Sequence, residues 1–186
     1  AVMTAVAGGS TWGVTISAAP IGETNSLYAA GETYIGGSST RVGLTATTAV
    51  ETLFTMGINA RSFITTNRSV RVLAYGTTGA NGASKLVRMN VVANANDVYT
   101  LFSGAVNNVD WQGEYLITRM SFGNFIRMCR GNLSGVLANV SVSAASLDET
   151  IAWQLTVSAS STAATTDNVV LHNVIVTTIP GIPNIV

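Results

Sequence analysis

The stretch LDETIAWQLTV, residues 147–157, decides the fold class. Apolar side chains occupy every second position of its second half: Ile151, Trp153, Leu155 and Val157. Small or polar side chains fill the positions between them: Thr150, Ala152, Gln154 and Thr156. A period of two residues places these two sets on opposite faces of a β-strand, whereas a helix would mix them. A second strand, NVVLHNVIVT at residues 168–177, is expected after the polar loop that follows.

Working outward, the same alternation predicts seven more strands, at residues 51–58, 69–75, 85–92, 98–102, 114–120, 124–130 and 136–142. Turn-forming clusters separate them, such as GTTGANGAS at residues 76–84, and helical periodicity is missing. Residues 50–180 are therefore predicted to form an all-β, jelly-roll-like β-sandwich of about eight or nine antiparallel strands. An immunoglobulin-like sandwich remains an alternative, although its Cys–Trp–Cys pattern is not present. Prolines at 180 and 183 end the pairing and leave residues 181–186 as a tail.

Residues 1–49 differ from the rest because they are rich in Ala, Gly, Thr and Ser and carry only three charged side chains. Short β-like pieces occur at residues 11–17, 27–30 and 40–45. Alone, this segment could not bury enough apolar surface to offset its ordering entropy. We expect an extended N-terminal arm that attaches to another surface, with Trp12, Tyr28 and Tyr34 as anchors and Arg41 as a paired charge. The alternative is a disordered linker, which would seldom carry three aromatic residues.

Charge is scarce: nine basic and nine acidic residues cancel, and only 10% of the chain is charged. An ordinary soluble domain has about 25%. We expect neighbouring molecules to cover much of the surface, the alternative being that hydroxyls and amides keep it soluble. Eight of the nine basic residues are Arg, which suits pairing with carboxylates across interfaces. No basic surplus exists for counterion release, so a nucleic-acid partner is not expected.

The N-terminal residues 1–22 carry no charge, but glycines and Pro20 interrupt them. A membrane-spanning helix needs about 20 continuous apolar residues, and a secretory signal needs a positively charged start. Neither pattern is present. We therefore expect a chain made in the host cytoplasm, with no membrane partner.

The sequence offers little material for catalysis. His172 is the only histidine and is expected to be a half-buried structural residue, and the lone Cys129 is expected to be a small core hydrophobe. One His and one Cys do not make a metal site. Asp148 and Glu149 are adjacent and would point to opposite faces of an extended chain, unlike the facing carboxylates of a glycosidase. We predict that the chain is not an enzyme and uses no metal or cofactor.

One group of neighbouring residues has the aromatic and polar side chains that a sugar-binding site needs. Trp111 lies in the polar stretch NNVDWQG, residues 107–113, which is expected to be a loop, and Tyr115 follows closely. An aromatic face can stack on a pyranose ring while nearby amides and carboxylates bind its hydroxyls. The alternative is that Trp111 closes the end of the sandwich as part of the core.

Taken together, residues 50–180 resemble the jelly-roll modules of tailed-phage virion proteins, especially capsid decoration proteins and head or tail fibres. The resemblance is carried by SVRVLAYG (69–76), KLVRMNVV (85–92), WQGEYLITRM (111–120) and the closing strand pair at 148–157 and 168–179. It implies a structural protein of the virion with no catalytic residues, which forms a trimer or dimer. It also implies attachment to the major capsid protein or another virion protein through the N-terminal part.

Two functional hypotheses follow. The first is a structural virion protein, of the capsid decoration, cement or head-fibre type, anchored through its N-terminal arm. The second is a carbohydrate-binding, receptor-recognition module of a phage fibre, whose partner would be a host-surface glycan bound at Trp111 and Tyr115.

Overall fold

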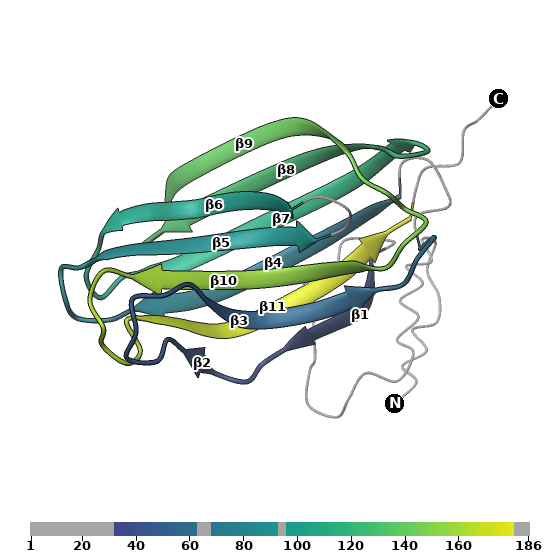
Figure 1. Ribbon diagram of the computed structural model, residues 1–186. Helices are drawn as coiled ribbons and strands as arrows, with labels where there is room; N and C mark the ends of the chain where they lie inside the picture. Colours follow the sequence, from purple (N-terminus) through teal and green to yellow (C-terminus); the bar gives the residue numbers. More distant parts are fainter. Residues whose placement is uncertain (1–31, 63–67, 93–95, 181–186) are drawn as a thin grey trace, which may run out of the picture.

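The computed structural model describes residues 32–62, 68–92 and 96–180, and within these ranges all regular structure is β-strand (Figure 1). One sheet has seven strands: β1 (Thr33–Ser38), β11 (Val169–Ile179), β4 (Ser69–Thr78), β7 (Asp110–Ser121), β8 (Asn124–Leu133) and β9 (Val136–Ser146) in spatial order, with β2 (Val42–Gly43) also paired to β11. The other has four: β3 (Glu51–Ile58), β10 (Trp153–Ser161), β5 (Ser84–Val92) and β6 (Asn96–Ala105). No helix in the described ranges is long and apolar enough to cross a membrane.

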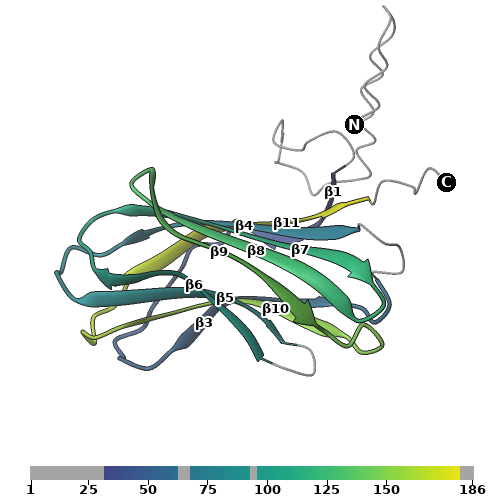
Figure 2. The ribbon, with the colours of Figure 1, turned by 90° about the horizontal axis from the view of Figure 1, so that it is seen from above.

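The two sheets stack face to face, and every strand pair is antiparallel (Figure 2). This confirms the all-β, jelly-roll-like sandwich. Each of the nine strands expected after residue 50 is present, as β3 to β11. The two additional strands, β1 and β2, lie in the segment that was expected to be an arm.

The boundary expected at residue 50 is wrong, because the sandwich begins at residue 33. Strand β1 pairs with β11 from Thr33 opposite Thr178 to Ser38 opposite Val174. Leu44 is 1% exposed in the core. Gly37 allows this close packing, because a Cβ on it would lie 2.1 Å from the carbonyl oxygen of Val174. Residues 1–31, including Trp12 and Tyr28, lie outside the described part of the chain.

Strand β10 lies between β3 and β5 in the smaller sheet, and its alternation fills the core. Trp153, Leu155 and Val157 are 3%, 2% and 1% exposed. Ile151 was expected on the same face but is 40% exposed, because the strand begins only at Trp153. A tight turn precedes it, in which the Thr150 amide donates to the Asp148 carboxylate at 2.8 Å.

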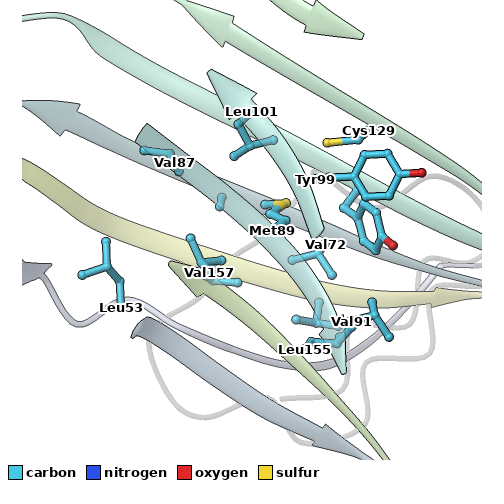
Figure 3. Close-up of a cluster of buried hydrophobic side chains, with 14 of the residues drawn as sticks. Leu53, Val72, Val87, Met89, Val91, Tyr99, Leu101, Cys129, Leu155 and Val157 are labelled. Carbon is cyan, nitrogen blue, oxygen red and sulfur yellow. The ribbon is translucent and has the colours of Figure 1, made fainter. Parts of the chain in front are cut away.

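The core lies between the two sheets and draws on both (Figure 3). Side chains from the smaller sheet meet those of the larger sheet, and the labelled members include Leu53, Val72, Val87, Met89, Val91, Leu101, Leu155 and Val157. Because the inward positions of each strand alternate with outward ones, the outer faces of the sheets are left to contact solvent or other molecules.

Candidate assembly surface

Trp111 and Tyr115 are core residues of β7, 2% and 1% exposed. The Trp111 indole lies 6.3 Å from the ring of Phe102, and its Nε1 donates to the Thr77 carbonyl at 3.3 Å. The Tyr115 ring lies 5.2 Å from that of Tyr99. Stacking on a sugar requires an exposed ring face, so the proposed glycan platform is wrong and the core alternative for Trp111 is confirmed. The loop expected at residues 107–113 is also wrong in its second half, since β7 begins at Asp110.

Two of the four residues predicted to take part in assembly, Tyr34 and Arg41, lie in the described part of the chain, and both make contacts within it. Tyr34 is half-buried in β1, opposite Thr177 of β11. Arg41 is exposed, and its Nη2 lies 2.7 Å from Asp167 Oδ2. The role of both residues in assembly stays a prediction, and Arg41 already has a carboxylate partner in its own chain.

Other arginines show the same internal pairing, which differs from the expected use of Arg across interfaces. On the outer face of the larger sheet, Arg71 lies 3.1 Å from Glu32 and 2.8 Å from Glu114. Arg130 binds the second oxygen of Glu114 at 3.1 Å. The charges of this face therefore largely neutralise one another.

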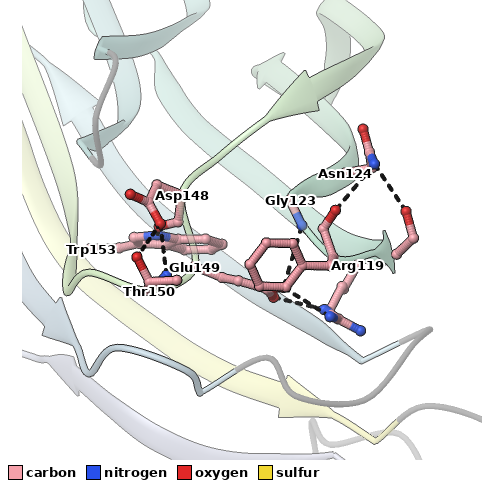
Figure 4. A network of polar contacts seen from close by, with 9 residues as sticks. Arg119, Gly123, Asn124, Asp148, Glu149, Thr150 and Trp153 are labelled. Atoms are coloured by element: carbon pink, nitrogen blue, oxygen red, sulfur yellow. Dashed lines mark hydrogen bonds and ion pairs between the residues drawn. The ribbon is translucent and has the colours of Figure 1, made fainter.

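The most buried ion pair joins Arg119 of β7 to Glu149 of the turn before β10 (Figure 4). Arg119 Nε lies 2.7 Å from Glu149 Oε2, and its Nη2 lies 2.8 Å from Oε1. The Gly123 amide donates to the same carboxylate at 3.3 Å. The hydrogen bonds from Arg119 hold the pKa of Glu149 below its ordinary value. The pair fixes the turn between the sheets, so Glu149 has a structural role.

The one lysine is used inside the fold as well. Lys85 is fully buried, and its Nζ donates to the carbonyl oxygens of Asn81, Ala83 and Val106. Burial lowers its pKa. These bonds tie the β4–β5 turn to the end of β6, which makes Lys85 a structural residue rather than a surface charge.

The residues considered for catalysis are separate from one another. Cys129 is 2% exposed, as expected, and burial raises the pKa of its thiol to about 12. His172 was expected to be half-buried but is exposed, because a register shift in β11 at this position turns it outward, where it bonds Thr77 Oγ1 at 3.0 Å. The described residues contain no group of three or more His, Cys, Asp or Glu that could hold a metal ion.

The surface that is available for assembly lies on β9, at the edge of the larger sheet (Figure 1). On the outer face of β9, Val140 and Val142 are 54% and 66% exposed, and a β-bulge places Leu137, 54% exposed, on the same side. Val136, at the start of the strand, is 70% exposed and lies opposite Leu133. The eleven residues VLANVSVSAAS include no charge, proline or glycine. Among the described strands only β8 pairs with β9, so its other edge presents unpaired backbone groups.

This apolar surface continues onto β8, where Met128 lies opposite Val142 and Ile126 lies opposite Ala144. Ile126 is 41% exposed. We call the whole surface the β9 stripe, and it consists of Leu137, Val140, Val142 and Ala144 with Ile126 and Met128. Arg130, which lies opposite Val140, borders it. Exposed apolar surface of this kind commonly marks a site of interaction.

The inward side of β9 is fixed by polar contacts. Asn139 Nδ2 donates to the Thr100 carbonyl of β6, and the Ser143 hydroxyl bonds the Tyr99 hydroxyl. Arg127 Nη2 donates to the same Ser143 oxygen at 3.1 Å. The strand is therefore held against the smaller sheet by its polar face, which leaves the valines outside.

The sequence predicted one face for Val136, Ala138, Val140 and Val142, and this is wrong for Val136, because a β-bulge places Leu137 on the side of Val140. Alternation also does not show whether such a face points toward the core. The sequence did hold a signal for this orientation. The alternate positions are polar (Asn139, Ser141 and Ser143), and the strand carries no charge.

Comparisons with known proteins find no related sequence, and they find solved structures of low similarity. No protein family model and no curated protein sequence matches the chain. Among solved structures, it is similar to the CBM2 module of the evolved Dit of Lactobacillus casei BL23 phage J-1, with 9% identity and a TM-score of 0.39 over 66% of this chain and 67% of that one. It is also similar to a chain of infectious bursal disease virus Gt strain (14% identity, TM-score 0.30, 79% of this chain, 32% of that one) and to one of the Gx strain (12%, 0.22, 82% and 37%). Because all three TM-scores are below 0.5, we draw no functional conclusion from them.

Proposed function

We propose that this chain is a structural protein of a virion, of the capsid decoration, cement or head-fibre type, which assembles with copies of itself and attaches to the particle through its N-terminal residues. The β9 stripe is the observation that carries the proposal. The low charge of the chain and its resemblance to phage jelly-roll modules support it.

An exposed, long, uncharged edge strand is a hazard for a protein that works alone, because it invites pairing with other chains. Another edge strand of this sandwich, β3, contains the charged residue Glu51, and a charge discourages pairing. Strand β9 has no charged residue. A partner that regularly covers β9 would explain why this edge is left unprotected.

The free energy available from covering the β9 stripe is modest but sufficient to matter. Fully burying a valine side chain contributes roughly 1.5 to 3 kcal/mol. Leu137, Val140 and Val142 are 54%, 54% and 66% exposed, so covering them would contribute roughly 1 to 2 kcal/mol each. Hydrogen bonds to the free edge would add to this.

The partners in this proposal are other copies of the chain, as a trimer or dimer, and the major capsid protein or another virion protein. Glu114, Glu149 and His172 make contacts within the fold, which fits a protein that acts by binding. The glycan-binding alternative relied on Trp111 and Tyr115, and their burial removes its basis.

Light scattering coupled to size-exclusion chromatography tests the proposal. The full chain should elute as a dimer or trimer, and Val140→Lys on the β9 stripe should shift it toward monomer. Val98→Lys is the matched control, because Val98 is 45% exposed on the other nearby edge strand, β6. A full chain that stays monomeric at every concentration, or equal effects of the two substitutions, would contradict the proposal.

A further inference from the structure

Two candidate occupants of the free edge of β9 can be compared by size: the same face of a second copy, or a strand added to the edge. The β9 stripe spans eight residues along the strand, from Leu137 to Ala144, and two strands across. At about 3.4 Å per residue and 4.8 Å per strand it covers about 27 Å by 10 Å, or roughly 270 Å². A stable interface buries about 800 Å² on each partner. Face-to-face packing of two stripes is therefore too small by itself, whereas an added strand also forms main-chain hydrogen bonds.

A segment of this chain has the pattern that such a strand needs. Residues 11–17, TWGVTIS, alternate Trp12, Val14 and Ile16 with small or polar residues, and they carry no charge. Strand β9 alternates in the same way, with valines outward and Asn139, Ser141 and Ser143 inward. Paired side by side, the apolar set of one strand would lie beside the apolar set of the other, as cross-strand neighbours prefer. Pro20 lies beyond the segment and would not interrupt the ladder.

The length of the chain before the described residues allows this contact. Fourteen residues separate Ser17 from Glu32, where the described structure begins, and they span at most about 50 Å. Glu32 precedes β1, at the opposite edge of the sheet from β9. The donor segment therefore starts from the edge of the sheet opposite to the acceptor edge.

We propose that residues 11–17 of one copy add as a strand to the free edge of β9 in a neighbouring copy, with Trp12, Val14 and Ile16 covering the β9 stripe. This rests on the proposed self-assembly and names its contact. The donor and acceptor edges lie at opposite sides of the sandwich, so each molecule gives a strand to one neighbour and receives one from another, as in a ring.

Amide hydrogen exchange in the full-length chain tests this contact. Val14→Pro removes a backbone donor and fixes φ in the donor segment, and Val140→Lys places a charge on the acceptor. Each should speed amide exchange in β9 about tenfold or more and lower the oligomeric mass. Val6→Pro in the N-terminal segment and Val98→Lys on β6 are the matched controls and should change neither.

A mixture of the two variants separates donation to a neighbour from folding back. The Val14→Pro chain keeps an intact β9, and the Val140→Lys chain keeps an intact donor segment. If the strand is donated to a neighbouring molecule, mixing restores protection of β9 in the Val14→Pro chain. The β9 peptide of this chain differs in mass from that of the Val140→Lys chain, so exchange in each can be measured separately. Restoration supports the proposal, and an unrestored β9 overturns it.

The remaining outcomes distinguish this inference from the proposed function. If Val14→Pro leaves β9 protected and the oligomer intact, the strand donation is overturned while self-assembly stands. If the wild-type chain is a monomer at every concentration, self-assembly fails and the donation fails with it.

Discussion

The buried pair of Arg119 and Glu149 provides a prediction whose magnitude follows from the structure. Arg119→Met keeps most of the side-chain volume but removes the cation from a carboxylate that is 5% exposed. Both Arg119 hydrogen bonds, at 2.7 and 2.8 Å, are lost, and the Gly123 amide then remains as a donor to the Glu149 carboxylate. Removing one member of a buried ion pair costs about 3 to 5 kcal/mol. That is a large part of the 5 to 15 kcal/mol by which domains are typically stable, so we expect a marked loss of stability at pH 7.

The loss should depend on pH with a definite sign. In the wild type Arg119 lowers the pKa of Glu149 in the folded state below its ordinary value of about 4.5. This contribution is complete above pH 4.5 and disappears as the pH falls through the folded-state pKa. In Arg119→Met the burial of Glu149 remains without the cation, which raises its pKa instead. The variant should therefore recover part of its deficit as the pH falls from 7 toward 4.5.

Urea unfolding of the full chain at pH 7 and near pH 4.5, followed by tryptophan fluorescence, measures both effects. The double variant Arg119→Met/Glu149→Gln should regain stability relative to Arg119→Met, because it removes the uncompensated charge. Arg41→Met is the matched control: its partner Asp167 is 40% exposed, and such surface pairs contribute about 0 to 1 kcal/mol. A loss below about 1 kcal/mol for Arg119→Met, or a deficit that grows on acidification, would refute this reasoning.

Three further predictions concern the core. Trp111→Ala should cost about 3 to 5 kcal/mol in a urea unfolding experiment because the indole is 2% exposed, and a cost below 1 kcal/mol would contradict its place in the core. Gly76→Ala should destabilise the fold by at least 1 to 3 kcal/mol in the same assay, since the added Cβ would lie 2.0 Å from the Val170 carbonyl oxygen and 2.4 Å from Trp111, whereas the control Gly82→Ala, with open space around it, should be nearly neutral. The Cys129 thiol, whose burial raises its pKa to about 12, should react with a disulfide reagent at pH 8 only at the rate of unfolding, and rapid labelling of the native chain would show that it is accessible.

Strands β10 and β7 show which residues of the core a local sequence pattern can predict. Trp153, Leu155 and Val157 could be assigned to the core because strict alternation needs only neighbouring residues to be recognised. Ile151 obeyed the same alternation but is exposed, because it follows the turn formed by Asp148 and Thr150 and β10 begins only at Trp153. Trp111 was placed in a loop because its neighbours are polar, although β7 continues through them in register with β4 and β8.

The candidate surface was harder to predict than the fold, for a related reason. The run from Val136 to Val142 has the same period as a strand that fills the core, and nothing local tells its two faces apart. The arrangement of the sheets decides the matter: β9 lies at an edge, beside β6, which provides partners for Asn139 and Ser143. With the polar face held inside, the valines point to solvent.

The sequence by itself determined that this chain is a two-sheet β-protein. Side-chain alternation with a period of two is a property of neighbouring residues, so it can be recognised without knowing which strands pair. The sequence also determined the scarcity of charge. Only the tertiary structure decided that β1 and β2 complete the sandwich, that Trp111 and Tyr115 are buried, and that β9 has a free edge. These features depend on which distant strands pair, and strand pairing is a long-range property that no local pattern encodes.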